Sequence, residues 1–178
     1  MFWRRQTQTN SPEPPATADE AVDLLPGGAA GAQFALGLKF ASAPDDDRDY
    51  SQALQYYLKA AAGHHPLAQF NLGIMYSLGQ GVPRDPNQAC EWFRVAAEHG
   101  DAGAQYQLAR LYERAALETS GPHAAEFRTE AWKWYRLAAA QGYGEAEMAL
   151  HTLSLRIPRH EAEEARRRAE SFRPGIGA

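Results

Sequence analysis

The chain has 178 residues, 44% hydrophobic and 22% charged, which is ordinary for one globular domain. A net charge of −4 and an isoelectric point near 5.9 give no electrostatic reason to expect nucleic acid as a partner. The single cysteine, Cys90, excludes an intrachain disulfide, and no apolar run reaches the roughly 18 residues needed to span a membrane. We therefore expect a cytoplasmic protein without a membrane-spanning segment.

The first 30 residues lack the pattern that fills the rest of the chain. Residues 1–17 are rich in proline and polar residues without apolar periodicity, so they are predicted to be a disordered N-terminal tail. Residues 19–25 show a short helical pattern that superposes on a later helix when it is shifted by 36 residues. We interpret residues 18–30 as a vestigial capping half-repeat.

The clearest helix pair lies between Pro66 and Gly100. Four apolar residues of the first helix follow helical spacing, and its predicted range is Pro66 to Leu78, ending at Gly79. In the second helix, Asp85 is the expected N-cap and Gly100 the end. Its stripe consists of Ala89, Trp92, Phe93, Ala96 and Ala97.

This pair recurs along the chain. Ala32, Ala68 and Ala104 are each 36 residues apart and begin similar segments, and a period of this length is typical of helical solenoids. The aromatic pairs of the second helices keep the same register, except that six residues are inserted before Trp134. The prediction is an all-α superhelix, or solenoid, of stacked antiparallel helix pairs. Its units are repeat 1 (31–66), repeat 2 (67–102), repeat 3 with a lengthened hairpin (103–144), and a degenerate repeat 4 with a C-terminal capping helix (145–174).

These repeats resemble the Sel-one-like repeats (SLRs), short relatives of the tetratricopeptide repeat. Repeat 2 matches the pattern of that family at Ala68, Leu72, Gly73, Tyr76, Gly79, Gly81, Val82, Asp85, Ala89, Trp92, Phe93, Ala96, Ala97 and Gly100. The likeness extends from about Gly31 to Leu155. It implies an α-solenoid that serves as an adaptor or scaffold for other proteins.

The sequence offers little support for catalysis. The six histidines show no i,i+4 pair at zinc spacing, no G-x-S-x-G motif occurs, and Cys90 has no identified base. We therefore expect no enzymatic activity, no metal and no cofactor. The acidic triplet Asp45 to Asp47 lacks the alternation and the final Glu of an EF-hand, so it is interpreted as a solvated loop.

The geometry of tetratricopeptide-like arrays, carried over to this chain, places certain residues of each first helix in a concave groove. The candidate partner-binding residues are Phe34, Leu38, Phe70, Ile74, Tyr106, Arg110 and Met148. Aromatic and arginine side chains are enriched at binding hot spots. The three rings have an alternative explanation, because a repeat also places a ring wherever neighbouring units pack.

The function predicted from these features is a protein–protein interaction adaptor that holds a partner polypeptide segment in the groove. One alternative is an exported cell-wall-related or β-lactam hydrolase or regulator, and another is a structural solenoid that self-associates weakly. Two further surfaces are left open as partner contacts. They are the lengthened third hairpin and the basic run Arg166 to Arg168, which could instead be a tolerated extension and a solvated face.

Overall fold

The computed structural model describes residues 28–44 and 48–175, and this part of the chain is helical without a strand. The helices are α2 (Gly28–Ala41), α3 (Tyr50–Ala62), α4 (Pro66–Leu78), α5 (Pro86–Glu98), α6 (Ala102–Glu118), α7 (Gly121–Ala140), α8 (Gly144–Ser154) and α9 (Arg159–Ser171). The predicted tail, the first ten residues of the half-repeat and the acidic triplet lie outside the described residues. Within the described ranges, every helix is too short or too polar to cross a lipid bilayer.

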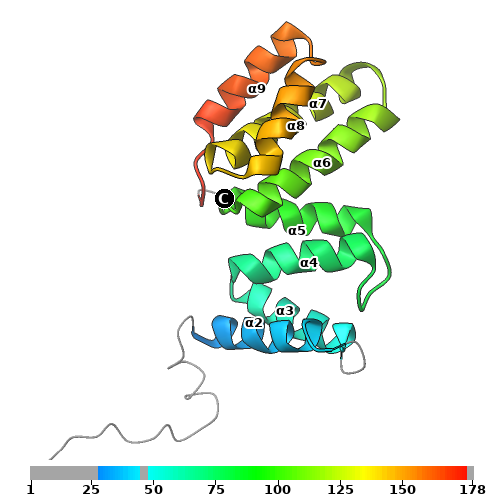
Figure 1. Cartoon of the computed structure of the whole chain (residues 1–178), viewed down its shortest axis with the longest axis vertical. Helices are drawn as coiled ribbons and strands as arrows, with labels where there is room; N and C mark the ends of the chain where they lie inside the picture. Colours follow the sequence, from blue (N-terminus) through cyan, green and yellow to red (C-terminus); the bar gives the residue numbers. More distant parts are fainter. Residues whose placement is uncertain (1–27, 45–47, 176–178) are drawn as a thin grey trace, which may run out of the picture.

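The helices stack as pairs in chain order. Helix α2 packs on α3, α4 on α5, and α6 on α7, while α3–α4 and α5–α6 contacts join one pair to the next along the long axis of the molecule (Figure 1). We call the first helix of each pair A-type and the second B-type. The predicted all-α solenoid is thereby confirmed.

Helix ends follow the local signals of the sequence. The Asp85 carboxylate accepts backbone N–H groups of Asn87 and Gln88 at 2.9 and 3.1 Å, so it caps α5 as predicted. Asp101 caps α6 in the same way. Helix α4 ends where Gly79 takes a left-handed conformation with φ of 74°, which a residue without Cβ adopts at no steric cost.

In the first two helix pairs, a ring of the B-type helix lies against a glycine of the A-type helix. The Phe93 ring lies so close to Gly73 that a Cβ added to this glycine would be 2.5 Å from the ring. A Cβ added to Gly37 would likewise be 2.6 Å from the ring of Tyr57. Phe93 is 2% exposed and belongs to the larger core cluster. Its neighbour Trp92 is only half-buried and packs against the cluster of the first two repeats.

The C-terminal helix does not pair with the helix before it. Both α8 and α9 pack on α7, and they make few contacts with each other. Phe172, just after α9, meets Trp134 of α7 edge to face at 5.3 Å between ring centroids. The Gly175 N–H then donates to the carbonyl of Glu98 in α5 at 2.9 Å. The last described residues therefore lie against the C-terminal end of α5.

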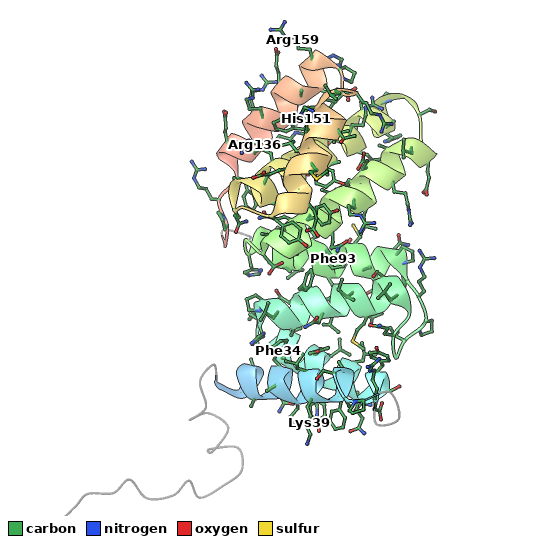
Figure 2. All side chains as sticks on the ribbon, in the orientation of Figure 1. Phe34, Lys39, Phe93, Arg136, His151 and Arg159 are labelled. Carbon is green, nitrogen blue, oxygen red and sulfur yellow. The ribbon has the colours of Figure 1, made fainter. Side chains whose placement is uncertain are left out.

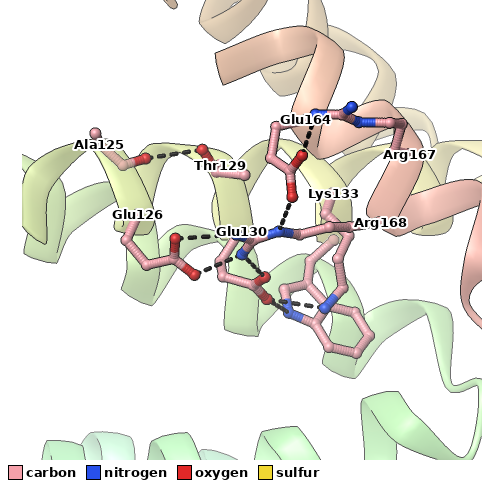
Figure 3. Close-up of polar contacts among 9 residues, drawn as sticks. Ala125, Glu126, Thr129, Glu130, Lys133, Glu164, Arg167 and Arg168 are labelled. Carbon is pink, nitrogen blue, oxygen red and sulfur yellow. Dashed lines mark hydrogen bonds and ion pairs between the residues drawn. The ribbon is translucent and has the colours of Figure 1, made fainter. Parts of the chain in front are cut away.

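A network of charges joins α9 to α7 (Figure 3). Arg168 of α9 donates to Glu164 of its own helix and to Glu126 and Glu130 of α7. The Glu130 side chain is 16% exposed and also accepts from Lys133. Burial raises the pKa of Glu130, but the hydrogen bonds and charges of Lys133 and Arg168 outweigh this effect, so the pKa is lowered from its ordinary value.

Replacement of Phe93 should be the most damaging single change in the central repeat. We expect Phe93→Ala to lower the free energy of unfolding by about 3 to 5 kcal/mol, because it opens a cavity in the larger core cluster. Trp92→Ala should cost less, since that ring is partly solvated. Urea denaturation followed by circular dichroism measures both. Equal losses would contradict the different packing of the two rings.

The contribution of Glu130 should depend on pH. The pKa of Glu130 is lowered in the folded protein, so the contacts of its ionised carboxylate stabilise the fold at neutral pH. This stabilisation is lost as the pH falls through the pKa of Glu130 in the folded protein. Glu130→Gln should therefore cost about 2 kcal/mol at pH 7, and the difference from wild type should shrink below about pH 4.5. Urea denaturation of both proteins at pH 7 and pH 3 tests this. A difference that stays constant would show that the network does not stabilise the charged form.

Candidate functional site

The ring residues of the A-type helices lie in the junctions between repeats. Phe34 stacks on His65, the residue before α4, at 4.4 Å between centroids, and its ring lies 5.7 Å from that of Tyr57 (Figure 2). Phe70 lies 5.8 Å from Phe93. In both cases the ring is half-buried between the two helices of its own repeat and the beginning of the next.

Tyr106 repeats this arrangement in the third pair. Its ring lies 5.7 Å from Tyr135 of α7 and 5.1 Å from Tyr143, just before α8. All three rings therefore have partners within their own junction. This geometry favours the packing explanation of the recurring rings, and a role for them in partner binding stays a prediction.

The other four predicted positions differ in exposure. Leu38 is 47% exposed and Met148 is 76% exposed, and Arg110 also lies on the surface. Ile74 is half-buried and packs against the larger core cluster. Of the seven residues, the structure brings Tyr106 and Arg110 together, with the guanidinium carbon 5.8 Å from the ring centroid. Arg110 lines a cleft that combines charge with apolar surface.

That cleft lies between α6 and the region where α4 passes into α5, and we call it the arginine cleft. Its volume is about 300 Å³. Ser77, Leu78, Arg84, Pro86, Ala89, Phe93, Gln107, Arg110, Leu111 and Arg114 line it. None of these described lining residues is acidic. Three cations and several apolar side chains thus face one small space.

Each arginine of the cleft is held by a different polar group. Arg84 Nε donates to the carbonyl of Ser77 at 3.1 Å, which fixes the loop that precedes α5. Arg110 Nη1 donates to the side-chain oxygen of Gln107 at 3.3 Å. Arg114 pairs with Glu118 at 3.3 Å. Arg84 and Arg110 form no ion pair with a described residue, so their charges are available to a ligand.

Two of these arginines were not identified from the sequence. Arg114 follows Arg110 by four residues, and this i,i+4 spacing indicates a shared helix face. Arg84 lies in the loop of the preceding repeat, 26 residues before Arg110. Only the stacking of α6 on α5 brings it to the same cleft.

The structure gives Cys90 no sign of nucleophilic activation. Burial raises the pKa of its thiol, more than the nearby Arg94 guanidinium lowers it, so the protonated form is favoured. The hydrogen-bonding neighbour of the sulfur is Arg94, at 4.0 Å, which cannot act as a base. Among the described residues, no three His, Cys, Asp or Glu side chains are grouped so that they could hold a metal ion.

Comparison with known proteins adds a family and two structural relatives. A family model for the Sel1 repeat matches residues 30–65, 66–101, 102–120 and 128–143, more than half of the chain. The stretch 121–127, which it leaves out, lies at the beginning of the long helix α7. None of the curated proteins matches this chain.

Two solved structures have the same architecture. A protective antigen of uropathogenic Escherichia coli strains, which displays an SLR fold, superposes with a TM-score of 0.68 at 28% identity over 80% of this chain. The chain spans only 29% of the length of that antigen. A Sel1 repeat protein from Oxalobacter formigenes gives a TM-score of 0.58 at 32% identity, over 69% of this chain and 88% of its own.

The different burial of the seven predicted residues has a measurable consequence. Tyr106→Ala should lower the free energy of unfolding by about 2 to 3 kcal/mol, because the ring loses its contacts with Tyr135 and Tyr143. Arg110→Ala and Met148→Ala should each change it by less than about 0.5 kcal/mol, since both side chains are exposed. Chemical denaturation distinguishes the two classes. A large loss for Arg110→Ala would show that this residue serves the fold.

Proposed function

Because the chain belongs to the Sel1 repeat family, we propose that it is a non-enzymatic interaction module that holds a segment of a partner protein on its A-helix surface. Proteins built from Sel1 repeats generally mediate protein–protein interactions. The specific proposal for this chain is that the exposed residues Leu38 and Arg110, on α2 and α6, belong to the contact surface.

One observation carries this proposal, namely the arginine cleft. This cleft presents two guanidinium groups, without a lining carboxylate, beside the exposed apolar side chain of Leu78. Arginine side chains that lie next to apolar surface are the type of residue that dominates protein interfaces.

The hydrolase alternative has no comparable support. Catalysis of that kind needs an activated nucleophile or a metal-bound water, with a positioned base. The Cys90 thiol is half-buried with a raised pKa. We therefore keep interaction, and not hydrolysis, as the proposed function.

Capture of partners from a lysate of the source cell tests the proposal. Wild-type chain and a Leu38→Glu, Arg110→Glu variant are compared after circular dichroism has shown that both are folded. Ile74 is left unchanged, because it packs against the core. We expect a partner that wild type retains and the variant loses by at least tenfold, measured by quantitative mass spectrometry.

Sedimentation at several protein concentrations provides the control for self-association. If the partner captured is another copy of the chain, the mass should rise with concentration, and the structural alternative would replace the adaptor. If wild type and variant retain the same partners equally, Leu38 and Arg110 are not part of the binding surface.

A further inference from the structure

The lining of the arginine cleft is basic in a chain that is acidic overall. The protein has 22 acidic residues against 18 lysines and arginines, and several arginines outside the cleft pair with carboxylates. Arg94 pairs with Glu91 at 3.0 Å, and Arg128 pairs with Glu161 at 2.7 Å. The cleft places three arginines together with a single pair, between Arg114 and Glu118. The lining of the cleft therefore carries an excess of positive charge that no lining carboxylate neutralises.

The two unpaired arginines are held in place without being neutralised. Arg84 uses Nε to reach the Ser77 carbonyl, and Arg110 uses one terminal nitrogen to reach Gln107. A guanidinium has five N–H donors, so each retains donors for a ligand. Because the neutral acceptors fix the side chains, less rotamer entropy is lost when an anion binds. This arrangement suits a carboxylate, which a guanidinium can bind through two parallel hydrogen bonds.

The remainder of the cleft is apolar. Leu78 at its edge is 62% exposed, and Leu111 of α6 is half-buried in its wall. A volume of about 300 Å³ accommodates one or two side chains of a ligand and not a folded surface. The matching ligand therefore combines carboxylates with a neighbouring apolar side chain.

We propose that the arginine cleft recognises an acidic segment of a partner protein, in which carboxylates flank an aliphatic or aromatic side chain. The carboxylates bind Arg84 and Arg110, and the apolar side chain packs on Leu78 and Leu111. This inference rests on the proposed function and specifies the chemistry of the segment that is held.

A nucleic acid fits the cleft less well. Single-stranded nucleic acid is bound by stacking of its bases on exposed rings as well as by charge. The ring that lines this cleft belongs to Phe93, which is 2% exposed and packed against Gly73.

Selection from a random library of 12-residue peptides displayed on phage tests the chemistry directly. The targets are the full-length wild type, an Arg84→Glu, Arg110→Glu variant, and Arg110→Glu alone in case Arg84 is needed for the loop. The matched control is Arg136→Glu, Arg166→Glu, which reverses two charges in a separate depression between α7, α8 and α9. Neither control arginine forms an ion pair with a described residue.

Wild type and control should enrich the same peptides, rich in Asp and Glu around Leu, Ile or Phe, and both cleft variants should lose them. A synthetic enriched peptide, labelled with fluorescein, should bind at least tenfold more weakly to Arg110→Glu by fluorescence anisotropy. Its affinity for wild type should fall with increasing salt.

Several results would overturn the inference. They are enrichment of neutral or basic peptides, equal enrichment by the cleft variants, no enrichment at all, or tighter binding of a 12-nucleotide RNA that the cleft variants lose. If a partner is still captured from lysate through Leu38 and Arg110, the proposed function stands and only the acidic chemistry is wrong. If neither partner nor peptide is retained, both proposals fail.

Discussion

The close contact between a B-type ring and a small A-type residue determines the architecture of this protein. Phe93 on Gly73 and Tyr57 on Gly37 leave no room for a Cβ, so the two helices of a pair approach more closely than larger residues would permit. Ala109, which is fully buried, occupies the equivalent position in the third pair. Because the same contact recurs, the pairs have similar shapes and stack in a regular order.

The stack ends where this contact is absent. In α8 the equivalent position carries His151, which is exposed, and Met148 stands where the other repeats have a ring. A B-type ring could not pack closely there. Helix α9 instead lies on α7, where the Arg168 network and the Phe172–Trp134 contact hold it. The absence of the ring contact at α8 thus accompanies the packing of α9 on α7.

Features set by local sequence signals, such as helix bounds and caps, were predicted from the sequence. Features that depend on how the helices stack were not. The period of 36 residues and the cap at Asp85 were sufficient for the fold class and for the bounds of α4 and α5. The sequence also predicted a C-terminal capping helix within residues 145–174, but it did not specify that α9 would pack on α7. Periodicity also could not decide between core and ligand surface for Phe34, Phe70 and Tyr106, because both demand the same spacing.

The arginine cleft illustrates how positions that do not repeat give one repeat a surface that differs from that of its neighbours. Arg110 occupies the place that Ile74 and Leu38 hold in the two preceding repeats, 36 and 72 residues earlier. The recurring rings Phe34, Phe70 and Tyr106 pack at the junctions between repeats, and all three are aromatic. A charge at a non-recurring position alters the surface without disturbing the stack, since Arg110 is exposed while Ile74 is packed against the core. A change at such a position therefore alters the chemistry of the surface while the ring contacts that maintain the solenoid stay the same.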